Sequence, residues 1–126
     1  MDLNSTTNAA PGFAKTPDYV ITFENADQEL VATLQGQVIA RSKRAVILKE
    51  SNHTPVVYFP LNDVKLDTVS QTEKETFCPF KGTASYLSFG DEKNIAWSYE
   101  DPFEEMLEIK KYIAFYTDRL DAPILA

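Results

Sequence analysis

The segment 76–86 gathers side chains that could do chemistry. Cys78 is the only cysteine of the chain, and Lys81 stands three residues further on, between Pro79 and Gly82. A proline and a glycine this close favour a tight turn, whose backbone N–H groups and neighbouring ammonium would bind an anion. Lys81 would also stabilise the thiolate of Cys78 and make it a nucleophile. The structural alternative is a small buried cysteine beside a strand, a turn and a solvated lysine.

A second group of candidates is aromatic. Trp97 is the only tryptophan, and Tyr99 follows it closely, while Tyr86 and Tyr58 stand in other apolar stretches. These rings would form a wall that stacks on a planar or sugar-like ligand, or a core that buries large area with polar tips. Both interpretations hold together if one ring edge faces a cleft. The predicted ligand site comprises Lys81, Gly82, Tyr86, Trp97, Tyr99 and Tyr58.

Glu50 is the third candidate, because it closes an apolar stretch that ends at this carboxylate. Near Lys81 it would serve as an ion-pair partner or a general base, and otherwise it is a solvated strand end. The candidate catalytic residues are therefore Cys78, Lys81 and Glu50. His53, the only histidine, stands in a polar turn that already accounts for it. One cysteine and one histidine do not make a structural zinc site, so we expect no metal ion and no cofactor.

Length, composition and charge limit the classes of protein to which this chain can belong. A chain of 126 residues is one domain. Its net charge of −7 gives an acidic surface that repels phosphate backbones, so we expect no nucleic-acid partner. A single cysteine forms no internal disulfide, which favours a reducing, cytoplasmic location. No apolar run approaches the roughly 20 residues that span a bilayer, so we expect no membrane association.

Alternating and β-branched stretches predict short strands, many of them paired as hairpins. We place them at residues 19–23, 30–34, 38–41, 45–50, 56–59, 82–89, 95–99 and 112–116, with a connector at 63–69. Asp101 as N-cap, Pro102 at N1 and Glu104 at N3 predict one short helix. The expected fold class is mainly β, with hairpins and one short helix in the C-terminal half. Residues 1–17 are expected to form a flexible arm, and residues 18–126 a single β-rich domain.

Several motifs in sequence order carry a family resemblance. They are Gly36-x-Val38-x-Ala40-x-Ser42-x-x-Ala45-x-x-Leu48-x-Glu50, Tyr58-Phe59-Pro60-x-x-Asp63-Val64, Thr76-x-Cys78-Pro79-x-Lys81-Gly82-x-Ala84-x-Tyr86, Ala96-Trp97-Ser98-Tyr99-x-x-Pro102 and Ala114-Phe115-Tyr116. Together they resemble the domain-of-unknown-function 427 family over residues 18–118. The resemblance implies a small, mainly β protein with a compact arrangement of coiled β-sheets, and no assigned activity. Many relatives carry an acidic residue at the position of Arg41 and a basic one at that of Leu61, so the charge of a pocket there would differ.

The family is sometimes labelled nucleotidyltransferase-like. This sequence has no Gly-Ser followed by paired acids for metal ions and no Gly-rich phosphate loop, so it gives that chemistry no support. We predict instead a domain of unknown function with a single pocket for a small, partly anionic metabolite. The alternatives are an enzyme that uses Cys78, Lys81 or Glu50, and an interaction module that forms a homodimer through an exposed strand such as 112–116. Both a monomer and a homodimer fit the sequence.

Overall fold

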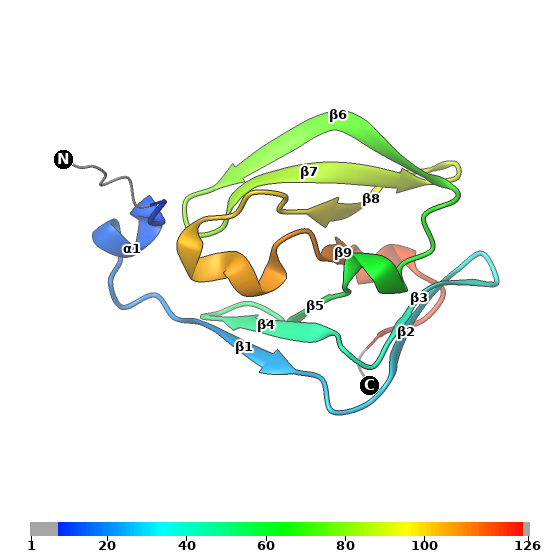
Figure 1. Ribbon diagram of the computed structural model, residues 1–126, viewed down its shortest axis with the longest axis horizontal. Coiled ribbons are helices and arrows are strands. Elements are labelled where there is room, and N and C mark those ends of the chain that lie inside the picture. Colours follow the sequence, from blue (N-terminus) through cyan, green and yellow to red (C-terminus); the bar gives the residue numbers. More distant parts are fainter. Residues whose placement is uncertain (1–7, 125–126) are drawn as a thin grey trace.

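Three antiparallel sheets carry the chain in the computed structural model, which describes residues 8–124 (Figure 1). The strands are β1 (Ile21–Asn25), β4 (Val46–Glu50) and β5 (Val56–Tyr58) in one sheet, β2 (Leu30–Leu34) and β3 (Gln37–Ser42) in a second, and β6 (Val69–Cys78), β7 (Gly82–Phe89), β8 (Glu92–Ser98) and β9 (Ile113–Phe115) in a third. The helices are α1 (Pro11–Lys15) and the short 3-10 helices η1 (Leu61–Asp63), η2 (Glu104–Ile109) and η3 (Thr117–Arg119). The predicted mainly β fold class is confirmed.

Strand β4 lies at the centre of the three-stranded sheet, between β1 and β5. Its residues Val46, Ile47 and Leu48 are all buried, although successive side chains of a strand point to opposite faces. Val46 and Leu48 pack into one hydrophobic cluster, and Ile47 packs into the other. The uninterrupted apolar run in this stretch is therefore the signature of a strand covered on both faces.

The two larger sheets are joined edge to edge where β5 ends and β9 begins. The backbone N–H of Phe59 donates to the carbonyl of Ile113, and the N–H of Ile113 donates back to Phe59, each over 2.8 Å. All three residues of β9 are buried. The stretch 112–116 is therefore not the exposed strand that the sequence suggested for pairing with a second copy, and homodimer formation itself stays a prediction.

Strand β6 has no counterpart among the strands predicted from the sequence. It is the outer strand of its sheet and pairs with β7 alone, and most of its residues are exposed. Exposed positions carry polar residues such as Glu73, Lys74 and Glu75, so the strand shows no hydrophobic alternation. Charged residues on an outer strand also hinder pairing with another chain. Backbone pairing with β7, rather than burial, defines this element.

The predicted helix near residue 101 is shorter and differently capped than expected. Asp101 does not cap it; η2 follows Phe103, without a side-chain cap, and Met106 has non-helical backbone angles. The chain must then return to pair β9 with β8, and it does so through a hydrogen bond from the N–H of Lys111 to the carbonyl of Tyr99. Two short 3-10 turns that meet at Met106 therefore stand where a regular helix was expected.

Residues 8–15 of the expected N-terminal arm make defined contacts, whereas residues 1–7 lie outside the described part. The N–H of Ala10 donates to the Glu105 carboxylate over 2.9 Å, and α1 packs on the turn between β6 and β7. The N–H of Gly12 donates to the carbonyl of Pro79 over 2.9 Å. A side chain at Gly12 would meet the ring of Phe80 first and then the carbonyl of Pro79.

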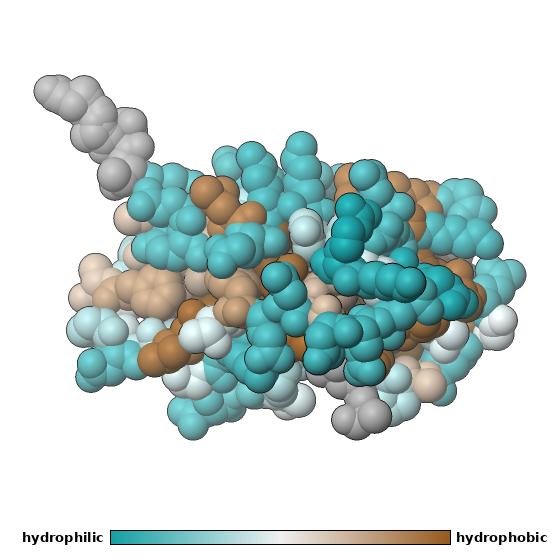
Figure 2. All heavy atoms as spheres, turned by 60° about the horizontal axis from the view of Figure 1, so that its bottom comes forward, coloured by the Kyte–Doolittle hydropathy of each residue, from teal (hydrophilic) through white to brown (hydrophobic). Residues whose placement is uncertain are grey.

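Hydrophilic side chains cover most of the face shown in Figure 2, with hydrophobic ones between them. The most exposed of the large apolar side chains is Phe77, whose exposed fraction is 63%. Within residues 8–124, no helix has the length and apolar character to cross a membrane.

Substitution of Gly12 by alanine tests the packing of α1. Alanine favours a helix over glycine by about 1 kcal/mol, but a Cβ here would lie 2.7 Å from the ring of Phe80. Phe80 has little room to yield, because its ring lies against both Phe13 and Tyr19. We expect the steric term to win, with a net loss of about 1–2 kcal/mol in the free energy of unfolding, measured by chemical denaturation. In a Phe80→Ala background the same substitution should be neutral or stabilising; an equal loss there would refute the steric explanation.

Candidate functional site

The predicted turn between β6 and β7 is present, and glycine is required at its end. Gly82 has a φ of +118°, a conformation that residues with a Cβ rarely adopt. A Cβ at this position would also lie 3.4 Å from the Cα of Pro102. The N–H of Phe103 donates to the carbonyl of Lys81 over 3.1 Å, so the turn is attached to the segment before η2.

Lys81 does not point into water. Its Nζ lies 2.5 Å from Oε1 of Glu50, and only 13% and 9% of the two side chains are exposed. The second carboxylate oxygen of Glu50 accepts a hydrogen bond from the hydroxyl of Tyr19. The carboxylate of β4 thus binds one donor from the β6–β7 turn and one from the segment before β1. We call these three residues the Glu50 cluster.

Charge and burial act in opposite directions on Glu50. Burial alone would raise the pKa of the carboxyl, but hydrogen bonds from Lys81 and Tyr19, with the charge of Lys81, outweigh it and lower the pKa. Burial, together with the hydrogen bond to Glu50, raises the pKa of Tyr19 to about 12. The cluster therefore holds an ionised pair and a neutral phenol at neutral pH. Because Glu50 already balances the charge of the Lys81 ammonium, Lys81 is a poor group for binding a further anion.

Aromatic rings cover the turn that carries Lys81. Phe80 stacks on Tyr19 with ring centres 4.2 Å apart and meets Phe13 of α1 edge-on at 5.0 Å. The turn therefore fastens the N-terminal segment to the domain, which is a structural role that the residues 76–86 did not reveal on their own.

Three tyrosines of the predicted ligand site are core residues. Tyr58, Tyr86 and Tyr99 are buried and pack in one hydrophobic cluster with η2. Burial raises the pKa of Tyr58 and of Tyr99, so both phenols stay neutral. The hydroxyl of Tyr58 accepts a hydrogen bond of 3.3 Å from the indole Nε1 of Trp97, which satisfies the polar tip of each ring.

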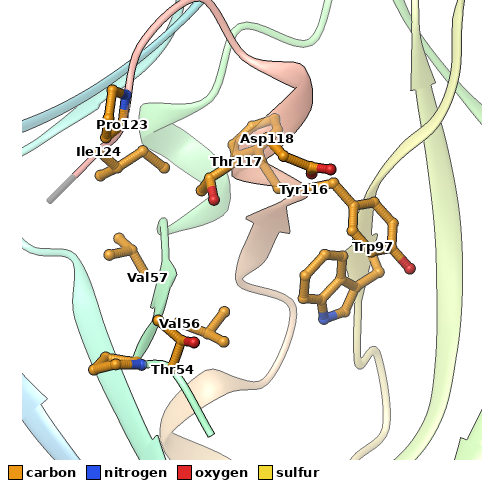
Figure 3. Close-up of a pocket in the computed structure, with 11 residues that line it drawn as sticks. Thr54, Val56, Val57, Trp97, Tyr116, Thr117, Asp118, Pro123 and Ile124 are labelled. Atoms are coloured by element: carbon orange, nitrogen blue, oxygen red, sulfur yellow. The ribbon is translucent and has the colours of Figure 1, made fainter.

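Trp97 reaches beyond this core and lines an open hollow of about 570 Å³ (Figure 3). We call it the Trp97 hollow. Its walls come from the chain around β5, from Trp97 and from the segment that follows β9, and they comprise Thr54, Pro55, Val56, Val57, Trp97, Phe115, Tyr116, Thr117, Asp118, Pro123 and Ile124. In Figure 3, Trp97 and Tyr116 stand on one side, with Val57 and Ile124 across the space from them. Neither Lys81 nor Glu50 belongs to these walls.

Sequence reasoning missed the partner of Trp97 in this hollow. The rings of Tyr116 and Trp97 pack with centres 4.7 Å apart. A hydrogen bond to Tyr86, with burial, raises the pKa of Tyr116 to about 12. The available signal was an aromatic residue directly after the last strand, a position where a side chain leaves the sheet. The sequence pattern instead predicts that Tyr116 is part of the strand 112–116.

The remaining candidates take no part in the Trp97 hollow. Cys78 is a free, half-buried thiol at the end of β6, and His53 is exposed. No group of three His, Cys, Asp or Glu side chains in the described part of the chain is arranged to hold a metal ion. Catalysis by Cys78, Lys81 or Glu50 stays a prediction.

Comparison with protein-family models gives a match to this chain. The family model described as "Domain of unknown function (DUF427)" matches residues 22–125, which is most of the chain. No curated protein matches.

Replacing Lys81 by methionine tests the Glu50 cluster. A buried carboxylate without its cation is costly, so we expect the free energy of unfolding to fall by about 3 kcal/mol in denaturant titrations. Lys49→Met is the matched control, because Lys49 also pairs with a glutamate, Glu24, at 3.1 Å, but both side chains are about half exposed. It should cost less than about 1 kcal/mol. Similar losses for the two variants would show that the Glu50 cluster is no more than a surface ion pair.

Acid should weaken the fold through Glu50. Its pKa is lowered in the folded state, so its contribution is present above the unfolded value of about 4.3 and is lost as pH falls through the folded value. Denaturant titrations from pH 7 downward should therefore show wild type losing more stability than Glu50→Gln below about pH 4.3. Glu24→Gln controls for the change in net charge. Parallel curves for wild type and Glu50→Gln would contradict the cause assigned to the shift.

Proposed function

Since the chain belongs to the domain-of-unknown-function 427 family, whose description assigns no activity, we propose a function from the site itself. The chain binds a small planar molecule in the Trp97 hollow. One observation carries the proposal. The sole tryptophan presents its ring to a hollow of about 570 Å³ instead of lying wholly in the core. Sites for small molecules have this size and combine apolar and aromatic walls with a few polar groups.

The lining supports a ligand that stacks. Trp97 and Tyr116 offer ring surface, and Val57 and Ile124 offer apolar contact across the hollow. A flat ligand between these walls would bury area on both of its faces. Thr54 and Thr117 supply hydroxyl groups at the walls, which would orient polar groups on the edge of the ligand.

Charge supports a neutral or cationic ligand. Among the wall residues that the structure describes, Asp118 alone is charged. The expectation of a partly anionic ligand depended on Lys81 sharing a pocket with Trp97, whereas Lys81 binds Glu50 in a separate cluster. Arg119, the cation nearest in sequence, is directed to Glu92 and to the carbonyl of Lys93. An anion would therefore meet a carboxylate here and no facing cation.

Fluorescence of Trp97 gives a direct test, because no other tryptophan contributes. The probes are benzamidine, benzamide and benzoate, which share a ring and differ in charge. We expect the first two to change the emission with saturation, and benzoate to bind about fivefold more weakly than benzamidine because Asp118 repels it. Asp118→Asn should remove that difference between the charged probes.

Tyr116→Ala should weaken benzamide about tenfold, since it removes one aromatic contact. Phe77→Ala is the matched control: Phe77 is an exposed ring outside the hollow, and its loss should leave the affinity unchanged. The proposal fails if none of the three probes alters the emission up to millimolar concentrations, or if Tyr116→Ala binds them as wild type does.

A further inference from the structure

A second cavity, of about 230 Å³, lies on the other face of the four-stranded sheet. Trp97 and Tyr86 face the Tyr58 core, and their neighbours Ser98 and Ser85 point the opposite way because side chains alternate along a strand. We call this space the serine cavity. The residues that matter for its chemistry are Ser85, Ser98, Leu61, Leu66, Glu100 and Lys111.

Two buried hydroxyls lie in the wall of the serine cavity. Ser85 of β7 and Ser98 of β8 stand directly opposite each other, with exposed fractions of 8% and 6%. Neither hydroxyl has a hydrogen-bond partner among residues 8–124, although the hydroxyls of Ser42 and Ser88, the other buried serines there, have two and one. A buried hydroxyl without a partner is unfavourable. A ligand with a polar group inside the cavity would satisfy both.

The lining also carries two opposite charges. Glu100 comes two residues after Ser98, and Lys111 comes two residues before Ile113, which pairs with Ser98. A hydrogen bond from the N–H of Lys111 to the carbonyl of Tyr99 holds these two segments together. Both charged residues are exposed, and neither forms an ion pair with any residue between 8 and 124. A carboxylate and an ammonium on one wall suit a ligand that carries both charges itself.

Apolar side chains line another part of the serine cavity. Leu61 and Leu66 line the cavity from the segment around η1, and both are partly exposed despite their size. Leu87 of β7 lies on the sheet side. These side chains would contact a short aliphatic chain of a ligand in the cavity.

We propose that the serine cavity binds a free α-amino acid with a short polar side chain. Its carboxylate would pair with Lys111 and its ammonium with Glu100, while its side-chain amide or hydroxyl would bond to Ser85 and Ser98. The apolar residues would contact the carbons between these groups. This site is separate from the Trp97 hollow, and the proposal does not depend on the one made there.

Calorimetric titration with L-asparagine, L-glutamine and L-threonine tests the proposal. At least one should bind with saturation. N-acetyl-L-asparagine and L-asparagine amide, each lacking one charge, should bind about tenfold more weakly than L-asparagine if that is the ligand, because a charge-assisted bond is lost. Binding should leave Trp97 emission unchanged, since the indole faces the opposite side of the sheet.

Two variants separate a binding role from a structural one. Ser98→Ala should weaken binding of the amino acid about tenfold without lowering the melting temperature of the free protein, because the hydroxyl it removes has no partner within residues 8–124. Lys111→Gln should also weaken binding about tenfold, whereas Lys110→Gln, an exposed neighbour outside the cavity, should have no effect. The proposal is overturned if no amino acid binds at millimolar concentration, if both site variants bind normally, or if a crystal grown with the amino acid holds only water at the two hydroxyls.

Discussion

The buried carboxylate of Glu50 is the constraint on which the arrangement of this domain depends. It stands at the end of a central strand, and its two oxygens accept from Lys81 of the opposite sheet and from Tyr19 of the chain before β1. A buried ion pair is weak evidence for net stability, because desolvation offsets the attraction. The pair instead favours one arrangement of the sheets over others. Any packing that separates the two charges leaves one of them buried without an opposite charge.

The pair of Lys81 and Glu50 also explains why the candidate residues from the sequence lie in separate sites rather than in one pocket. Lys81 is used inside the structure, so the positive charge is absent from the aromatic wall that Trp97 and Tyr116 form. Strand alternation then separates Trp97 from Ser98 by the thickness of one sheet. One short motif, Trp97-Ser98-Tyr99, thereby serves the Tyr58 core, the Trp97 hollow and the serine cavity at once.

An element of the fold could be predicted from the sequence where its formation depends on buried apolar side chains. Strands such as β2 and β4 bury apolar side chains, so their pattern predicted them nearly to the residue. Strand β6 depends on backbone pairing and shows no such pattern. An ion pair between Lys81 and Glu50 was one of three interpretations of Glu50, which the sequence places at the end of an apolar-rich stretch. The hollow was not predictable, because Tyr116 meets Trp97 through the path of the chain after β9 rather than through any spacing in the sequence.

That path is held at two points, and the Trp97 hollow depends on both. Arg119 donates to the carbonyls of Lys93 and Asn94 at the start of β8. Asp121 accepts from the N–H groups of residues 35 and 36 in the β2–β3 turn, at 2.9 and 2.8 Å. On either side of these attachments the chain presents Asp118, Pro123 and Ile124 to the hollow. This wall of the hollow is therefore set by attachments to the start of β8 and to the β2–β3 turn, and its shape is a property of the whole fold rather than of a local motif.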